Sequence, residues 1–252
     1  GKESCLKLYG DFLRDMIAYI ENGKHPNLFL HTNGLLYAEG KNKAITWMNG
    51  MIDGKPVNPR SGYIVEFNAL WYNDIKFVAW LFSDTSETEY TAHLEEMASL
   101  CKDAFVATFL NNYGYLYDYV DGNMVDWSVR PNMILAAAVD YSPLEQSQKK
   151  SVVDICTREL LTPKGLRSLS PKSGGYTPVC VGDQDYRTRV YHQGTAWPWL
   201  GGFYLEACLK LYKRTRLSFV ERQLIGYEDE VMNHCLGTIP EYFDGNPPYS
   251  GR

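Results

Sequence analysis

The sequence has no excess of positive charge and no long apolar run. Its 25 lysines and arginines are outnumbered by 30 acidic residues, giving a formal net charge of −5 at pH 7. Nucleic acids and anionic membranes attract clustered positive charge, so neither is an expected partner. No segment approaches the run of about 18 apolar residues needed for a membrane span, and no signal peptide is visible at the N-terminus. The composition favours a neutral or weakly polar partner.

Motifs for metals, phosphates and covalent catalysis are also missing. The six cysteines are scattered, without a C-x-x-C pair, which predicts reduced packing thiols and a cytoplasmic location. His31, His93 and His234 are isolated along the chain, so no metal site is expected. The chain contains neither a glycine-rich phosphate loop nor a G-x-S-x-G or H-E-x-x-H signature. We therefore expect no cofactor.

The sequence does contain helical periodicity, interrupted by long loops. The expected helices span 6–20, 66–83, 86–110, 132–139, 142–161, 194–213 and 218–236. Asn33-Gly34 predicts the turn of a short hairpin, and Ser86 with Glu89 forms a capping-box pattern. Residues 44–62, 111–131 and 162–191 are expected loops. Short turns that alternate with long loops predict an all-α fold, an α/α toroid of helical hairpins with its long loops at one mouth.

Aromatic and hydrogen-bonding residues are concentrated in these loops. The chain has 19 tyrosines, 6 tryptophans and 10 phenylalanines. Many stand beside polar residues in TWMN, EFNALWYN, DWSVRPN, YHQGTAWPW and IPEYFDG. Pyranose rings have apolar faces that stack on aromatic rings and hydroxyl edges that need planar donors and acceptors. Core packing explains any one of these residues about as well, but their recurrence in successive loops favours a sugar site.

Five longer segments carry a more specific signal. They are AITWMNGMIDGKPVNPRSGYIVEFNALWYN, VRPNMILAAAVDYSPL, VDICTRELLTPKGLRSLSP, YHQGTAWPWLGGFYLEA and IPEYFDGNPPYSGR. Together they resemble the C-terminal amylo-α-1,6-glucosidase domain of microbial glycogen debranching enzymes, over essentially the whole chain and in the same order. The resemblance implies an (α/α)6 toroid glycoside hydrolase. It also implies hydrolysis, with inversion, of the single α-1,6-linked glucose left at a trimmed glycogen branch.

The resemblance implies two catalytic positions. Glu241 in IPEYFDG matches the general base that activates water, and Asn49 stands where the family has the general acid, an aspartate that closes a T-W-M-D motif. An amide cannot donate a proton as a carboxylic acid does, and losing a general acid costs on the order of 100- to 10,000-fold in rate. Three explanations stay open: a substitution made to trap a ligand, a natural divergence, or a different acid such as Asp53.

The resemblance and the side-chain chemistry also predict a sugar-binding wall. We expect Trp197 to stack on a glucose ring while His192 and Gln193 bind its hydroxyl groups. The other expected members of the wall are Trp47, Glu66, Asn68, Trp71, Asp126 and Arg130. The expected partner is glycogen or a branched α-glucan oligosaccharide.

Residues 1–252 are expected to form part of a single toroid domain. The chain accounts for about seven of the twelve helices that the resemblance implies, so we expect it to be truncated at both ends. Helix faces that lose their neighbours in this way invite a second copy of the chain, which predicts a homo-oligomer. Two competing functions remain: a non-catalytic glucan-binding module, which Asn49 favours, and another toroid glycoside hydrolase or sugar phosphorylase.

Overall fold

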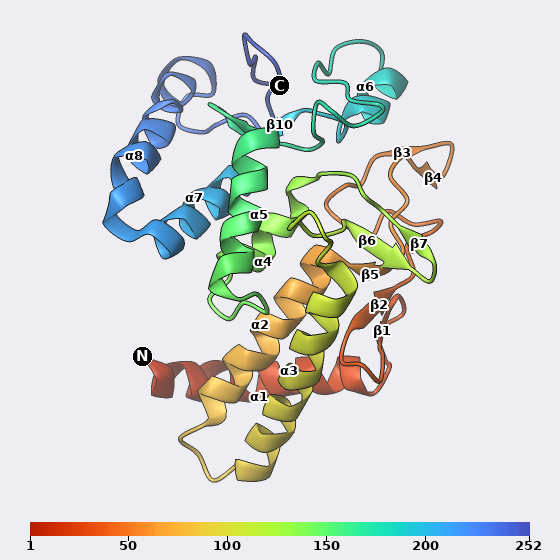
Figure 1. Ribbon diagram of the computed structural model, residues 1–252, viewed down its shortest axis with the longest axis vertical. Helices are drawn as coiled ribbons and strands as arrows, with labels where there is room; N and C mark the ends of the chain where they lie inside the picture. Colours follow the sequence, from red (N-terminus) through yellow and green to blue (C-terminus); the bar gives the residue numbers. More distant parts are fainter.

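The computed structural model describes residues 1–252, and the chain is mainly helical (Figure 1). Its α-helices are α1 Lys2–Glu21, α2 Val65–Phe82, α3 Thr88–Phe109, α4 Ile134–Ala138, α5 Gln146–Glu159, α6 Gln184–Val190, α7 Pro198–Tyr212 and α8 Leu217–Ile225. Shorter turns of helix are η1 Pro131–Met133, η2 Lys213–Arg216 and the π-helical η3 Glu230–His234. None of the helices combines the length and apolar character needed to cross a membrane.

The helices pack around one core. α2 packs along α3, α1 lies across α2, and α7 contacts both α4 and α5 (Figure 1). Eleven of the 18 residues of α2 are buried, as expected for a helix with neighbours on several sides. A single cluster of 39 buried residues extends from Ile17 in α1 to Val220 in α8. This continuous core fixes the helix ends from which the loops project.

Short antiparallel strands tie the loops together. The strands are β1 Leu28–Leu30, β2 Leu36–Ala38, β3 Met51–Ile52, β4 Lys55–Pro56, β5 Gly62–Ile64, β6 Tyr119–Asp121, β7 Met124–Val125, β8 Leu161–Thr162, β9 Gly165–Arg167 and β10 Ala196–Trp197. They form sheets of order β1-β2-β5-β6-β7 and β10-β9-β8, with β3-β4 as a separate hairpin. The predicted hairpin at Asn33-Gly34 is confirmed, because β1 pairs with β2 and Gly34 adopts a φ of 80°.

The predicted loops contain more structure than expected. Segment 44–62 holds the β3-β4 hairpin, whose turn residues Asp53 and Gly54 have φ values of 49° and 73°. Segment 111–131 holds β6 and β7, and segment 162–191 holds β8, β9 and α6. Strands of two or three residues are too short to show a period of two, so the sequence pattern could not reveal them.

The helix ends also differ from expectation in places. α2 lies almost where predicted, but α3 begins at Thr88, and its N-cap Glu87 makes no side-chain capping bond. The capping box predicted at Ser86 is therefore wrong, whereas Glu145 and Gln148 form one at the start of α5. α7 begins at Pro198, because the residues before it pair as β10.

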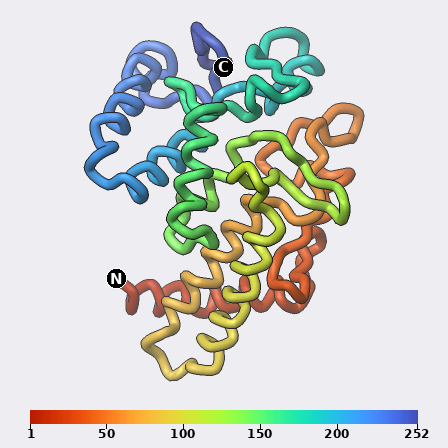
Figure 2. The backbone as a smooth tube through the Cα atoms, in the orientation of Figure 1, coloured from red at the N-terminus to blue at the C-terminus, as the bar shows by residue number.

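The segments with polar motifs meet at one end of the molecule. Figure 2 shows the C-terminal segment beside the segment that contains α6, and the backbone N–H of Gly245 donates to the carbonyl of Pro178 at 2.7 Å. Phe243 exchanges two backbone hydrogen bonds of 2.8 Å with Ala196. α6 in turn contacts β3. Three parts of the sequence therefore converge beside the start of α7.

Candidate active site

A polar cavity of about 520 Å³ lies where these segments converge. Its lining residues come from the TWMN segment, from α6 and its end, and from the IPEYFDG segment: Asn49, Gly50, Met51, Gln184, Arg187, Thr188, Tyr191, Glu241 and Tyr242. We call this space the polar cavity. Both predicted catalytic positions, Asn49 and Glu241, line it. Its volume is within the range of about 300–1,000 Å³ that is usual for small-molecule sites.

Asn49 projects from a tight turn between two buried neighbours. Its N–H donates to the carbonyl of Trp47 at 2.9 Å, and the N–H of Met48 donates to Thr46 Oγ1 at 3.2 Å. Met48 and Gly50 are buried, whereas Asn49 is exposed. A Cβ on Gly50 would lie 3.0 Å from the carbonyl oxygen of Thr188, so glycine permits the close approach of α6. The turn thus presents residue 49 to the polar cavity.

Glu241 is held on the other segment. Its carboxylate Oε2 accepts a 2.5 Å hydrogen bond from the hydroxyl of Tyr191, the residue that follows α6. The backbone two residues later is fixed by the pairing of Phe243 with Ala196. The Glu241 side chain is otherwise exposed. A solvent-facing carboxylate with one oxygen held in place suits a group that binds or activates water.

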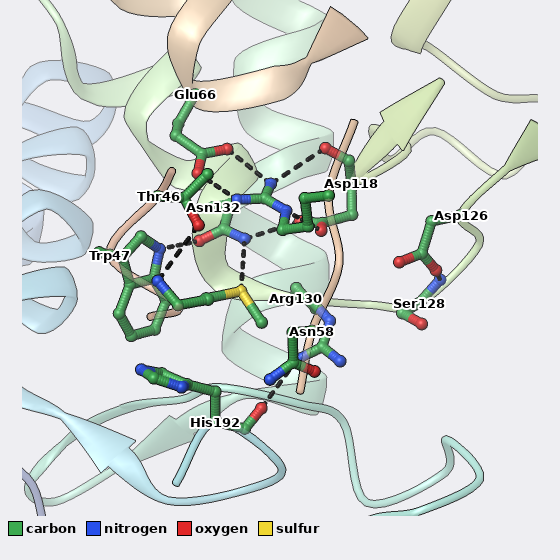
Figure 3. Close-up of polar contacts among 12 residues, drawn as sticks. Thr46, Trp47, Asn58, Glu66, Asp118, Asp126, Ser128, Arg130, Asn132 and His192 are labelled. Carbon is green, nitrogen blue, oxygen red and sulfur yellow. Dashed lines mark hydrogen bonds and ion pairs between the residues drawn. The ribbon is translucent and has the colours of Figure 1, made fainter. Parts of the chain in front are cut away.

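A network of buried polar groups ends at Trp47, whose carbonyl accepts from the N–H of Asn49 but whose side chain does not line the polar cavity (Figure 3). The Arg60 guanidinium pairs with both carboxylate oxygens of Glu66, and its Nε lies 2.7 Å from Asp118 Oδ2. The latter contact is an ion pair without hydrogen-bond geometry, since neither atom has a hydrogen-bond partner. Asp118 Oδ1 accepts from Asn132 at 2.7 Å, and Asn132 Oδ1 accepts from Trp47 Nε1 at 2.7 Å. We call these five residues the buried network.

Comparison with known proteins identifies the family of this chain. The model of the family described as amylo-alpha-1,6-glucosidase matches residues 4–252. The chain belongs to the amylo-alpha-1,6-glucosidase family. Glycogen debranching enzyme of Saccharomyces cerevisiae is 26% identical over 227 residues, covering 72% of this chain and 15% of the yeast protein. The chain thus spans only a small part of that curated relative.

Solved structures agree on the fold of this amylo-alpha-1,6-glucosidase family member. A mannosylglycerate hydrolase of family GH63 from Thermus thermophilus superimposes with a TM-score of 0.55 at 14% identity, over 79% of this chain and 44% of the hydrolase. Neutral trehalase Nth1 from Saccharomyces cerevisiae gives 0.58 at 14% identity, over 73% of this chain and 34% of the trehalase. Both have the (α/α)6 toroid fold, so the predicted fold class is confirmed.

Trp197 does not have the surface that sugar stacking requires. It is only 4% exposed, and its ring is stacked against His192 on centroids 5.2 Å apart and against Tyr242 at 5.4 Å. Its Nε1 donates to Thr195 Oγ1. Because Trp197 is buried between two rings, neither ring face is open in this structure, and its stacking on glucose stays a prediction.

His192 is likewise buried. Its exposed fraction is 0%, and neither ring nitrogen has a hydrogen-bond partner. Burial, and next the positive charge of Arg130, lowers the pKa of His192 to about 3, so the imidazole is neutral at pH 7. The ring does not line the polar cavity, and its contact with a sugar hydroxyl stays a prediction.

Arg130 and Gln193 brace the loops against each other. Arg130 Nη1 donates to the carbonyls of Ser168 and His192 at 3.0 and 2.9 Å, and Nη2 donates to Gln193 Oε1 at 3.1 Å. Gln193 Nε2 then donates to Asn58 Oδ1 at 2.9 Å. Asp126 accepts from the N–H of Ser128 and, like Arg130 and Gln193, does not line the polar cavity. These three predicted contacts are occupied by protein partners.

Three further predicted wall residues belong to the interior. Asn68 is fully buried and bonds to the backbone of Leu36 and Ile64, which ties α2 to β2. Trp71 is 5% exposed and lines a separate apolar groove of about 320 Å³ between α1 and α2. Glu66 is neutralised by Arg60 within the buried network. These three residues have protein partners in this structure, and their sugar contacts stay predictions.

Most residues that line the polar cavity were not predicted from the sequence. Gln184, Arg187 and Thr188 lie on α6, inside a stretch predicted to be a loop. Arg187 Nη2 donates to Gln184 Oε1 at 2.8 Å. Tyr191 and Tyr242 directly neighbour the predicted site residues His192 and Glu241 in the YHQG and PEYF motifs. Their place beside those motifs is the feature of the sequence from which they could have been predicted. Asp53 lies in the β3-β4 turn and does not line the polar cavity.

Proposed function

We propose that the polar cavity is a glycosidase active site that hydrolyses α-1,6-glucosidic branch linkages of glycogen or limit dextrin with inversion. Glu241 is the general base in this proposal, and residue 49 occupies the position of the general acid. The observation that carries the proposal is that these two positions, 192 residues apart in the sequence, line one cavity. Membership of the amylo-alpha-1,6-glucosidase family supports the same substrate class.

The proposed base step follows from the setting of Glu241. Its carboxylate is exposed to solvent, and Oε2 is held by Tyr191. The remaining oxygen is free to accept a proton from a water molecule. In an inverting reaction that water attacks the anomeric carbon from the face opposite the leaving group, and the product is released as the β-anomer.

The acid step is where this chain departs from the family pattern. Departure of a sugar hydroxyl requires a proton, and the Asn49 side chain has none to give at neutral pH. The chain as it stands should therefore cleave branch linkages on the order of 100- to 10,000-fold more slowly than a form with an acid there. A substrate whose leaving group needs no proton, such as α-glucosyl fluoride, should be much less affected.

The residues that we propose as sugar contacts differ from those expected from the sequence. Because Trp197, Trp71 and Asn68 are buried, the groups that can reach a sugar are those that line the polar cavity. Tyr242 offers part of a ring, while Gln184 and Arg187 offer donors for hydroxyl groups. Arg187 and Gln184 are exposed and already aligned with each other. We propose that they bind the glucan chain that carries the branch.

The test is glucose release from a limit dextrin carrying single α-1,6-linked glucosyl stubs. We expect Asn49→Asp to raise the rate at least 100-fold over the parent chain, since it restores a group able to carry the proton. Asn123→Asp, in the exposed β6-β7 turn, is the matched control and should release no more glucose than the parent. Equal rates for the parent and Asn49→Asp would contradict the assignment of residue 49.

A second function is favoured by Asn49 itself. A site that has lost its acid but kept its cavity could bind glucan without cleaving it. Under this alternative, both the parent and Asn49→Asp bind the dextrin in calorimetry and neither releases glucose. Rapid hydrolysis by Asn49→Asp would instead assign the chain to catalysis.

A further inference from the structure

The hydrogen bond between Tyr191 and Glu241 gives the polar cavity a feature that the catalytic pair alone does not explain. The Tyr191 hydroxyl lies 2.5 Å from Glu241 Oε2, and this is the only hydrogen bond that the Glu241 side chain makes. We propose that Tyr191 is the positioning residue of Glu241, holding Oε2 so that Oε1 is presented to water. The catalytic meaning of this inference rests on the proposed function, whereas the contact itself does not.

Tyr191 is built to be rigid. Its ring packs against His192, Trp197 and Tyr242, with centroids 4.5, 5.0 and 4.9 Å away. Its carbonyl oxygen accepts a 2.5 Å hydrogen bond from Thr195 Oγ1. Three aromatic neighbours and a backbone anchor leave the hydroxyl little freedom to move. A donor fixed in this way can orient a partner that is itself mobile.

Glu241 needs such a partner because its side chain is exposed even though the backbone around it is held. Pro240 before it is buried, and the carbonyl of Tyr242 after it accepts from the N–H of Arg252 at 2.9 Å. An exposed glutamate side chain has many rotamers, and a single fixed donor removes most of that freedom. Without Tyr191, the carboxylate would sample positions away from the polar cavity.

The direction of the hydrogen bond is fixed by the chemistry of the phenol. Burial, and next the hydrogen bond to Glu241, raises the pKa of Tyr191 above its ordinary value. The phenol therefore remains protonated and donates, while the carboxylate accepts. The donated hydrogen bond thus holds the Glu241 carboxylate in place.

The deciding experiment follows the signal of the Glu241 carboxyl carbon by ¹³C NMR at pH 7 in the full chain. The Glu241 signal is identified as the one lost in Glu241→Gln. Tyr191→Phe keeps the aromatic ring and removes only the hydroxyl. Tyr37→Phe is the matched control, since the Tyr37 hydroxyl donates to Asp121 Oδ1 at 2.9 Å in the sheet, away from the polar cavity.

We expect the Glu241 carboxyl signal at pH 7 to move and to broaden in Tyr191→Phe, because the carboxylate loses the one hydrogen bond that holds Oε2. Tyr37→Phe should leave it unchanged. The kcat for α-glucosyl fluoride hydrolysis should fall about tenfold in Tyr191→Phe while KM stays at the parental value, as for the loss of a charge-assisted hydrogen bond that positions the base. An unchanged Glu241 signal in Tyr191→Phe would overturn the inference. A changed signal in a chain that hydrolyses no glucosyl fluoride would leave Tyr191 as the partner of Glu241 and remove the proposed function instead.

Discussion

The polar cavity and the buried network contain similar residues in opposite settings. In the buried network, Arg60, Glu66, Asp118 and Asn132 are all buried and bind one another. In the polar cavity, Asn49, Gln184, Arg187 and Glu241 are exposed, and the two proposed catalytic positions are not paired with each other. The first arrangement holds loops in place. The second leaves groups free to meet a ligand.

This difference shows that residue type alone does not identify a binding wall. Arg130, Gln193, Asn68 and Glu66 have the chemistry of sugar contacts, but protein partners occupy them. What distinguishes the polar cavity is unused hydrogen-bonding capacity next to solvent. The comparison predicts that changes in the polar cavity alter activity, whereas changes in the buried network alter stability.

The largest expected effect comes from Glu241→Gln. This change keeps the shape of the side chain and removes the proposed base, so hydrolysis of α-glucosyl fluoride should fall on the order of 100- to 10,000-fold. The free energy of unfolding should change by less than about 0.5 kcal/mol, because the side chain is exposed. Initial rates and urea unfolding measure the two effects.

The matched control for Glu241→Gln is Glu221→Gln on α8, an exposed glutamate outside the polar cavity. It should leave both the rate and the stability at the parental values. If Glu241→Gln retained full activity on α-glucosyl fluoride, the carboxylate would not be the base, and the polar cavity would not be the active site that we propose.

The buried network should respond in the reverse way to Glu66→Gln. Removing one carboxylate leaves the buried Arg60 with Asp118 as its only charged partner, so we expect a loss of about 3 kcal/mol in the free energy of unfolding. Urea unfolding provides the measurement, again beside Glu221→Gln. A loss below about 0.5 kcal/mol, the range of surface substitutions, would show that the ion pair does not hold the loops.

His192 should make the free energy of unfolding depend on pH, and this effect should be smaller than that of Glu66→Gln. The folded state lowers the pKa of His192 to about 3, so the unfolded chain binds a proton there first as the pH falls. The contribution of the neutral ring is complete above the unfolded pKa of about 6.5 and declines below it. When the pH is lowered from 7.5 to 5, the parent should lose about 2 kcal/mol of its free energy of unfolding because of His192.

Replacing His192 by Phe should remove this part of the pH dependence. The comparison is urea unfolding at pH 7.5 and 5, with His31→Phe, which deletes an exposed imidazole, as control. If the free energy of unfolding depended on pH identically in the parent and in His192→Phe, the imidazole would be able to take up a proton in the folded state, which contradicts its burial.

The sequence predicted the scaffold better than the wall of the site. Local periodicity located α2, the Asn33-Gly34 pair located the hairpin turn, and the resemblance singled out Asn49 and Glu241, which line one cavity. The partners of Asn68 and Trp197 depend on contacts between segments far apart in the chain, which no local pattern encodes. α6 was missed because seven polar-rich residues inside a long irregular stretch show no clear period.

We propose that Asn49 and Glu241 form the two halves of one inverting site, of which this chain retains the base. This can be tested by ¹H NMR of the first glucose anomer formed when the unaltered chain hydrolyses α-glucosyl fluoride. We expect β-glucose at early times, followed by mutarotation, because water attacks opposite the departing fluoride. Initial release of α-glucose, or no release above the Glu241→Gln background, would contradict it.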